Sequence, residues 1–284
     1  MTDNPAPRLR PFAQVDVFSA EPYRGNPLAV VLDGDGLDAH AMQRFANWTN
    51  LSETTFLLPP TDPRADYRVR IFTGSEEFPF AGHPTLGSAH AWLGAGGIPR
   101  RDGELVQECA AGLVRVRRDG GRLAFAAPPL TRSGPVAEAD LARIAAGLGL
   151  PRHELLDASW LVNGPEWIGV LLGSAEQVLA IRPDYAAMAG LKVGVIGPHP
   201  DGSGPGFEVR TFIPGDAAAE DPVTGSFNAG AAQWLIGTGR APSSYLAAQG
   251  TALGRAGRVH IEAAGDDVWV GGSSVSCIEG FVLL

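Results

Sequence analysis

The sequence is poor in lysine, in cysteine and in long hydrophobic runs. Lys192 is the single lysine, since arginine supplies the rest of the 22 basic residues, and Schiff-base chemistry would depend on that one side chain. Cys109 and Cys277 are the only cysteines, and they form neither a disulfide framework nor a C-x-x-C motif. We therefore expect two core thiols in a reducing compartment.

No stretch of the chain has the length and hydropathy of a membrane span or a secretion signal. The longest apolar runs, 28–32 and 168–172 among them, are far shorter than the ~18 residues that cross a bilayer. Residues 1–11 (MTDNPAPRLRP) lack the apolar segment of a secretory signal. We expect a cytoplasmic protein with no membrane partner.

The charge balance is acidic, with 31 acidic against 22 basic residues and a net charge of −9. A surface that binds the phosphates of nucleic acid needs the opposite balance, so no nucleic-acid partner is expected. The 284 residues are enough for one large domain or two smaller ones. Glycine and proline are abundant, at 37 and 23 residues, and such a chain must turn often.

The two halves of the chain repeat a common pattern. Arg70–Phe72 is followed by Gly82-His83 and an apolar stretch of small residues, and Arg210–Phe212 is followed in the same way by Gly225-Ser226. Gly25-Asn26-Pro27 and Asn163-Gly164-Pro165 occupy matching places earlier in each half. We interpret this as a duplicated fold. The predicted lobes are 1–128 and 129–284, joined by the proline-rich residues 126–130.

Periodicity predicts several strands and two surface helices. Residues 38–50 have helical spacing and an aspartate at their start, and 139–148 is expected to be the counterpart in the second half. The expected strands alternate or run apolar between turn residues, and they cover 12–18, 28–32, 67–72 and 113–117.

Two further helices are predicted at 85–95 and 227–237, and neither contains a charged residue. A helix without a polar face must be buried on all sides. We therefore predict an α+β fold of two pseudo-symmetric lobes. Each lobe is a mostly antiparallel β-sheet barrel wrapped around a central buried helix.

The turns before these buried helices are the expected place for chemistry. A helix N-terminus offers free N–H donors and about half a positive charge, so two such termini brought together would bind an anion. No Lys or Arg lies within either turn, which favours a small carboxylate over a phosphate. The alternative is that these turns are simple helix caps.

The candidate acid–base residues are Glu53, His83 and Asp221. A half-buried carboxylate can exchange a proton near neutral pH, but by spacing alone Glu53 is no better a candidate than Glu76, Glu77 or Glu220, and each could be a solvated glutamate. His90 is expected to be a core histidine. The six histidines are scattered without metal-ligand spacing, so no metal is expected. No G-x-S-x-G, Walker A, Rossmann or H-E-x-x-H motif is present.

Five motifs, in order along the chain, resemble the PhzF family of phenazine biosynthesis, which shares the two-lobed fold of diaminopimelate epimerase. The similarity extends from about Phe12 to Val282. The motifs are Gly25-Asn26-Pro27, Asn50-Leu51-Ser52-Glu53-Thr54, Phe78-Pro79-Phe80-Ala81-Gly82-His83-Pro84-Thr85, Glu220-Asp221-Pro222-Val223-Thr224-Gly225-Ser226 and Gln249-Gly250.

The resemblance implies an isomerase without a cofactor, usually a homodimer, with an active site in the cleft between the lobes. In the family's best-understood activity a glutamate moves a proton between ring carbons of 2,3-dihydro-3-hydroxyanthranilate. The resemblance implies that Glu53 is this glutamate. It also implies that His83 and Asp221 form hydrogen bonds to the substrate and take part in the proton transfer. Substrate and backbone contacts carry to Asn26, Ser52, Gly82, Gly225 and Ser226.

The resemblance also indicates departures. Diaminopimelate epimerase has catalytic cysteines where this chain has Ala81 and Thr224, so racemisation by two thiols is not expected. Phenazine enzymes typically have alanine at the places of Pro222 and Val223, which leaves the substrate open to an unknown analogue. A different class of function, a protein that binds a small carboxylate without transforming it, fits the same helix termini.

Overall fold

The computed structural model describes residues 7–202, 204–215 and 219–284, so residues 1–6 of the expected signal-free N-terminus lie outside it. The chain divides into two compact units, Met1–Ala126 with Gly271–Leu284 (the first lobe) and Ala127–Val270 (the second lobe). The division after Ala126 falls in the expected linker. The structure differs from the predicted range 129–284, since the C-terminal strand pairs with β1 in the first lobe.

The first lobe is a sheet with two helices. Its strands pair antiparallel except for β2 with β3 and β4 with β6, which are parallel. The elements are β1 (Leu9–Val17), β2 (Asn26–Val31), α1 (Ala39–Thr49), β3 (Thr54–Leu58), β4 (Tyr67–Phe72), β5 (Glu77–Phe78), α2 (Gly82–Gly94), β6 (Glu104–Cys109), β7 (Gly112–Asp119), β8 (Arg122–Ala126) and β18 (Ser274–Leu283).

The second lobe repeats this plan. Its parallel pairs are β11 with β12 and β13 with β15, at the places of the two parallel pairs of the first lobe. The elements are β9 (Arg132–Gly134), α3 (Glu138–Leu148), η1 (Arg152–Glu154), β10 (Asp157–Val162), β11 (Glu166–Leu171), α4 (Ala175–Ala180), β12 (Lys192–Pro198), β13 (Phe207–Phe212), β14 (Glu220–Asp221), α5 (Gly225–Gly237), β15 (Ser244–Gln249), η2 (Thr251–Leu253), β16 (Gly257–Ala264) and β17 (Asp267–Gly272).

The predicted partner of α1 is wrong. α1 connects β2 to the parallel strand β3, and the element that connects β11 to β12 is α4. The predicted 139–148 helix exists as α3, but it precedes β10 and has no counterpart before β1 among the described residues. Its apolar side chains Leu141, Ile144 and Leu148 pack into the second-lobe core.

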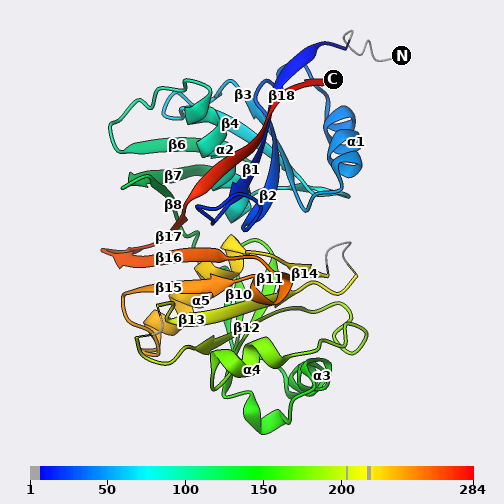
Figure 1. Cartoon of the computed structure of the whole chain (residues 1–284), viewed down its shortest axis with the longest axis vertical. Coiled ribbons are helices and arrows are strands. Elements are labelled where there is room, and N and C mark those ends of the chain that lie inside the picture. The colour runs from blue at the N-terminus through cyan, green and yellow to red at the C-terminus, as the bar shows by residue number, and fades with distance from the viewer. Residues whose placement is uncertain (1–6, 203, 216–218) are drawn as a thin grey trace. The chain divides into compact units, whose positions relative to one another are not determined.

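The central helices confirm the predicted fold class. The N-terminal halves of α2 and α5 are buried on every side, whereas α1 buries one face through Met42 and Ala46. α2 packs against strands from both ends of its sheet, including β1, β3, β8 and β18. Figure 1 shows α2 among these strands and α1 on the outside. No helix in the described part of the chain is long and apolar enough to cross a membrane.

Gly87 permits the close approach of α2 to the sheet. A Cβ at this position would lie 2.5 Å from Leu28 Cδ2 and 2.9 Å from Val17 Cγ2. We expect Gly87→Ala to lower the free energy of unfolding by about 1–3 kcal/mol through overpacking. Gly94→Ala in the same helix meets no atom within 4 Å, and it should be neutral or stabilising by up to about 1 kcal/mol. Urea unfolding of both variants checks this, and equal midpoints would contradict it.

Candidate active site

The central helices α2 and α5 begin without a side-chain cap, unlike the surface helices α1 and α4. The carboxylate of Asp38 accepts from Ala41 N in α1, and the hydroxyl of Ser174 accepts from Gln177 N in α4. α2 and α5 have neither such a bond nor an acidic residue in the first turn. α3 also lacks a cap, but Glu138 and Asp140 lie in its first turn. The first backbone donors of α2 and α5 are therefore not used by local side chains.

The first lobe brings together Asn26, Glu53 and His83, which we call the first-lobe cluster. His83 Nε2 lies 3.4 Å from Glu53 Oε2, and His83 Nδ1 lies 3.4 Å from Asn26 Nδ2. The Glu53 side chain is 15% exposed and that of His83 5%, so both are largely buried and the carboxylate is the more accessible of the two. Gly82 is the buried first residue of α2, and Ser52 precedes Glu53 and is partly buried.

Local turns place these side chains. Asn50 ends α1 in the left-handed conformation at φ 55°, and the Thr49 and Thr54 hydroxyls lie 3.0 Å apart across the short turn that carries Glu53. Before Asn26, a Cβ at Gly25 would lie 2.2 Å from the backbone oxygen of Val17, so only glycine fits there.

The second lobe builds a buried polar network before α5, which we call the second-lobe cluster: Thr211, Asp221, Thr224, Asn228 and Gln249. The Thr224 hydroxyl donates to Asp221 Oδ2 at 2.5 Å, and the Thr211 and Thr224 hydroxyl oxygens are 2.6 Å apart. Thr224 N donates to Gln249 Oε1 at 3.0 Å. The side chain of Gln249 is completely buried, and that of Asp221 is 9% exposed. The network fixes Asp221 and the start of α5 as one rigid unit.

Ser226, in the first turn of α5, is held by two neighbours from the strand side. The indole Nε1 of Trp167 donates to Ser226 Oγ at 3.0 Å, and Asn163 Nδ2 donates to the backbone oxygen of Ser226 at 2.9 Å. An indole N–H can only donate, so the serine oxygen is the acceptor. The hydroxyl proton of Ser226 is left to point elsewhere.

Two of the three other carboxylates considered from the sequence have arginine partners, and the third is exposed. Glu77 pairs with Arg70, and Glu220 pairs with Arg210. Glu76 is exposed. His90 lies 3.2 Å from the Ser276 hydroxyl, and burial lowers the pKa of its imidazole.

Neither cysteine lies in the turns before α2 and α5, where Ala81 and Thr224 stand. Burial raises the pKa of the Cys109 thiol, which disfavours its nucleophilic form. Among the described residues no three His, Cys, Asp or Glu side chains are grouped to hold a metal ion.

Sequence reasoning missed Thr211, Asn228 and Trp167. Gln249 was noted only as part of a motif, and Asn163 only as part of the repeat. Their hydrogen-bond partners are distant in the sequence: Trp167 and Ser226 are 59 residues apart, and Gln249 and Thr211 are 38 residues apart. The recurrence of Asn163 at the place of Asn26 was the one usable signal.

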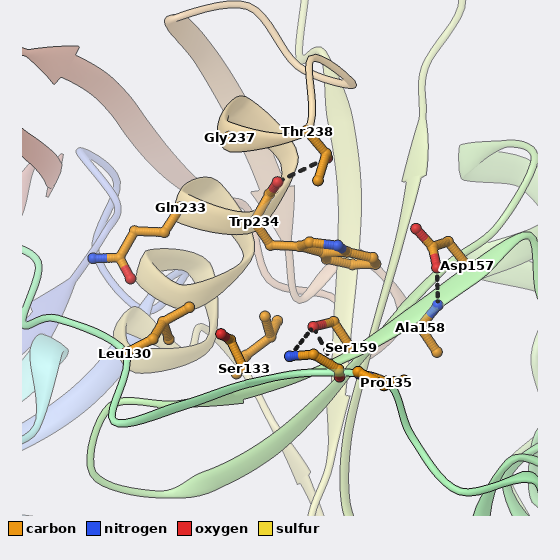
Figure 2. A pocket seen from close by; sticks show the side chains of 12 residues that line it. Leu130, Ser133, Pro135, Asp157, Ala158, Ser159, Gln233, Trp234, Gly237 and Thr238 are labelled. Atoms are coloured by element: carbon orange, nitrogen blue, oxygen red, sulfur yellow. Dashed lines mark hydrogen bonds between the residues drawn. The ribbon is translucent and has the colours of Figure 1, made fainter.

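A cavity of about 430 Å³ lies in the second lobe beside the C-terminal half of α5. Figure 2 shows the Trp234 indole above Ser159, with Gln233 extending from α5 in a different direction. None of the predicted site residues lines it. β9 here has three residues, whereas its counterpart β18 has ten and reaches α2 through Ser276.

The two lobes, each a sheet around a central uncapped helix, define the epimerase-like class of fold. The chain matches the family described as phenazine biosynthesis-like protein over residues 15–280, and it belongs to this PhzF family. A PhzF-family protein of Enterococcus faecalis has a similar structure, with a TM-score of 0.80 and 26% identity, covering 98% of this chain and 100% of that one. A hydroxyproline epimerase of Agrobacterium vitis, at 16% identity and a TM-score of 0.60, covers 98% of this chain and 93% of its own, and shares the fold alone.

Named relatives place the chain among enzymes of the isomerase class. The trans-2,3-dihydro-3-hydroxyanthranilate isomerase of Pseudomonas aeruginosa is 34% identical over 275 residues, which cover 94% of each chain. Antisense-enhancing sequence 1 of Schizosaccharomyces pombe is 37% identical over 292 residues, covering 95% of this chain and 97% of its own.

Proposed function

We propose that this protein is an isomerase that needs no cofactor and moves a proton between carbons of a small carboxylate-bearing molecule. The substrate is 2,3-dihydro-3-hydroxyanthranilate or an analogue of it. The observation that carries the proposal is the Glu53–His83 pair, 3.4 Å apart, beside the uncapped start of α2. The name of the 34% identical Pseudomonas isomerase supports the same reaction type.

In this mechanism Glu53 removes the proton from one carbon and returns it to another. The carboxylate is the more exposed member of the pair, and the largely buried imidazole of His83 lies 3.4 Å from it. A single carboxylate can act first as base and then as acid, because the proton it takes from the first carbon stays on the carboxyl group until it is delivered to the second carbon. His83 donates to or accepts from a substrate oxygen in the same step.

The substrate carboxylate is held by backbone donors and by Ser226. The uncapped N–H groups of Gly225 and Ser226 and the hydroxyl proton of Ser226 supply donors for an anion. Asn26, Ser52 and Gly82 supply further substrate contacts. We propose that Asp221 orients the substrate, and that the protein works as a homodimer in the cytoplasm.

Exchange of substrate hydrogen for deuterium tests the proposal. The protein is incubated in D₂O with trans-2,3-dihydro-3-hydroxyanthranilate and, in parallel, with a panel of small cyclic carboxylates. Deuterium entering at carbon supports the isomerase. Thermal stabilisation by a carboxylate without exchange favours a non-catalytic binding protein and overturns the proposal.

Trp167→Phe is expected to weaken substrate binding while leaving the fold intact. The ring that packs edge-on against Phe227 is kept, but the N–H that fixes the Ser226 hydroxyl is lost. One hydrogen bond of about 1 kcal/mol corresponds to a KM raised roughly 3–10-fold. Trp160→Phe is the matched control, since Trp160 stacks with Arg132 instead. Equal KM values for the two variants would contradict the assigned role of Ser226.

A further inference from the structure

The side-chain amide of Gln249 has a fixed orientation in the second-lobe cluster. The backbone N–H of Thr224 can only donate, and it points at Gln249 Oε1. Asn228 Nδ2 donates to the same oxygen at 2.9 Å. A flipped amide would bring its NH₂ group against both donors, so the carboxamide has one orientation.

The amide nitrogen of Gln249 therefore faces the two threonine hydroxyls. Nε2 lies 3.0 Å from Thr211 Oγ1 and 3.0 Å from Thr224 Oγ1. Both hydroxyl oxygens must accept from it, because an amide NH₂ group has no acceptor. A carboxylate oxygen can only accept, so the Thr224 hydroxyl gives its proton to Asp221 Oδ2 at 2.5 Å, and the Thr211 hydroxyl, 2.6 Å away, donates to Thr224 Oγ1.

We propose that Gln249 is a positioning residue that acts through Thr224, making the Thr224 hydroxyl a permanent donor to the carboxylate of Asp221. The expected effect on turnover rests on the proposed function, in which Asp221 orients the substrate, whereas the hydrogen bonding of Asp221 does not depend on it. The backbone oxygen of Asp221, 3.2 Å from Nε2, shares the two N–H groups of the amide with the threonine hydroxyls, so Gln249 contacts the main chain of Asp221 directly and its side chain through Thr224.

The first lobe contains a similar chain of hydrogen bonds, from a glutamine amide to a threonine hydroxyl, but its last acceptor is different. Gln107 Nε2 donates to Thr85 Oγ1, and the Thr85 hydroxyl donates to the backbone oxygen of Ala81, the residue before α2. The Tyr67 phenol donates to Gln107 Oε1, and burial raises its pKa, which keeps it a donor. The last acceptor is the backbone carbonyl of Ala81 in the first lobe and the carboxylate of Asp221 in the second lobe. Of the two glutamines, therefore, only Gln249 acts on a carboxylate.

Thr224→Val and Gln249→Glu test the proposal in two ways. Thr224→Val keeps the shape and removes the donor to Asp221, and Thr224→Ser restores it. Gln249→Glu keeps Oε1 but turns Nε2 into an oxygen that competes for the Thr224 proton and adds a like charge. We expect Thr224→Val to lower kcat roughly 10-fold or more with little change in KM, and Thr224→Ser to recover most of it.

The second measurement does not depend on turnover. ¹³C NMR titration of the Asp221 carboxyl group should show its pKa raised by about one unit or more in both Thr224→Val and Gln249→Glu. The neighbouring charges described in this lobe are the mutually paired Arg210 and Glu220 on β13 and β14, and Arg255 beside Gly250. Gln177→Glu on α4, whose amide contacts Gly173 and Glu154, is the charge control and should leave the titration unchanged.

The outcomes separate the two proposals. An Asp221 titration that is the same in wild type, Thr224→Val and Gln249→Glu overturns the positioning role of Gln249, whatever the enzyme does. A wild type that turns over no carboxylate, combined with the expected titration shifts, overturns the proposed function and leaves the assignment of Gln249 standing.

Discussion

Glu53→Gln should abolish most of the isomerase activity while leaving the protein folded. The amide has the shape of the carboxylate but cannot take a proton from carbon, and general acid–base groups typically contribute 10²–10⁴-fold to the rate. We expect a loss of kcat of about that size with a modest change in KM. The measurement is the rate of deuterium incorporation at the substrate carbon, followed by ¹H NMR.

The matched control is Glu76→Gln, which removes an exposed carboxylate from the same lobe. It should retain wild-type turnover. A Glu53→Gln enzyme within threefold of wild type would exclude Glu53 as the acid–base group. His83, the ion-pair neighbour at 3.4 Å, would then be the next residue to substitute.

The duplicated fold could be predicted from the sequence because its signals are local. The Arg-x-Phe strand and the glycine turn recur at nearly the same spacing, and α2 and α5 each have thirteen residues. The partner of α1 could not be predicted, since α4 has six residues and buries only Ala175 and Val178, too few for a helical period. β18 pairs with β1 across almost the whole chain, and no local pattern specifies such a partner.

The sequence motifs predict the candidate catalytic residues but not the residues that hold them in position. Glu53 and His83 lie in two motifs, and the structure places them in contact. Asp221 was chosen as a candidate, but the reason for its fixed position is Gln249, 28 residues further along the chain. A buried glutamine whose side chain makes five hydrogen bonds to four residues looks in the sequence like any strand residue, because these bonds form only when β13, β15 and α5 meet.

The pseudo-symmetric pairs Arg70–Glu77 and Arg210–Glu220 should differ widely in their effect on stability. Each arginine makes two bonds to its glutamate and lies over the phenylalanine two residues further on. The first pair is 27% and 33% exposed, and the second 5% and 8%. Water screens the first pair, so Arg70→Met should cost about 0–1 kcal/mol.

Arg210→Met should lower the free energy of unfolding by about 3–5 kcal/mol, because it leaves the Glu220 carboxylate buried without its cation. It also removes the donor to the backbone oxygens of Val178 and Ile181, which ties α4 to β13. Urea unfolding of both methionine variants under one set of conditions measures the difference. The double change Arg210→Met with Glu220→Leu should recover much of the loss, since no unpaired charge remains. Equal losses in Arg70→Met and Arg210→Met would show that burial does not set the strength of these pairs.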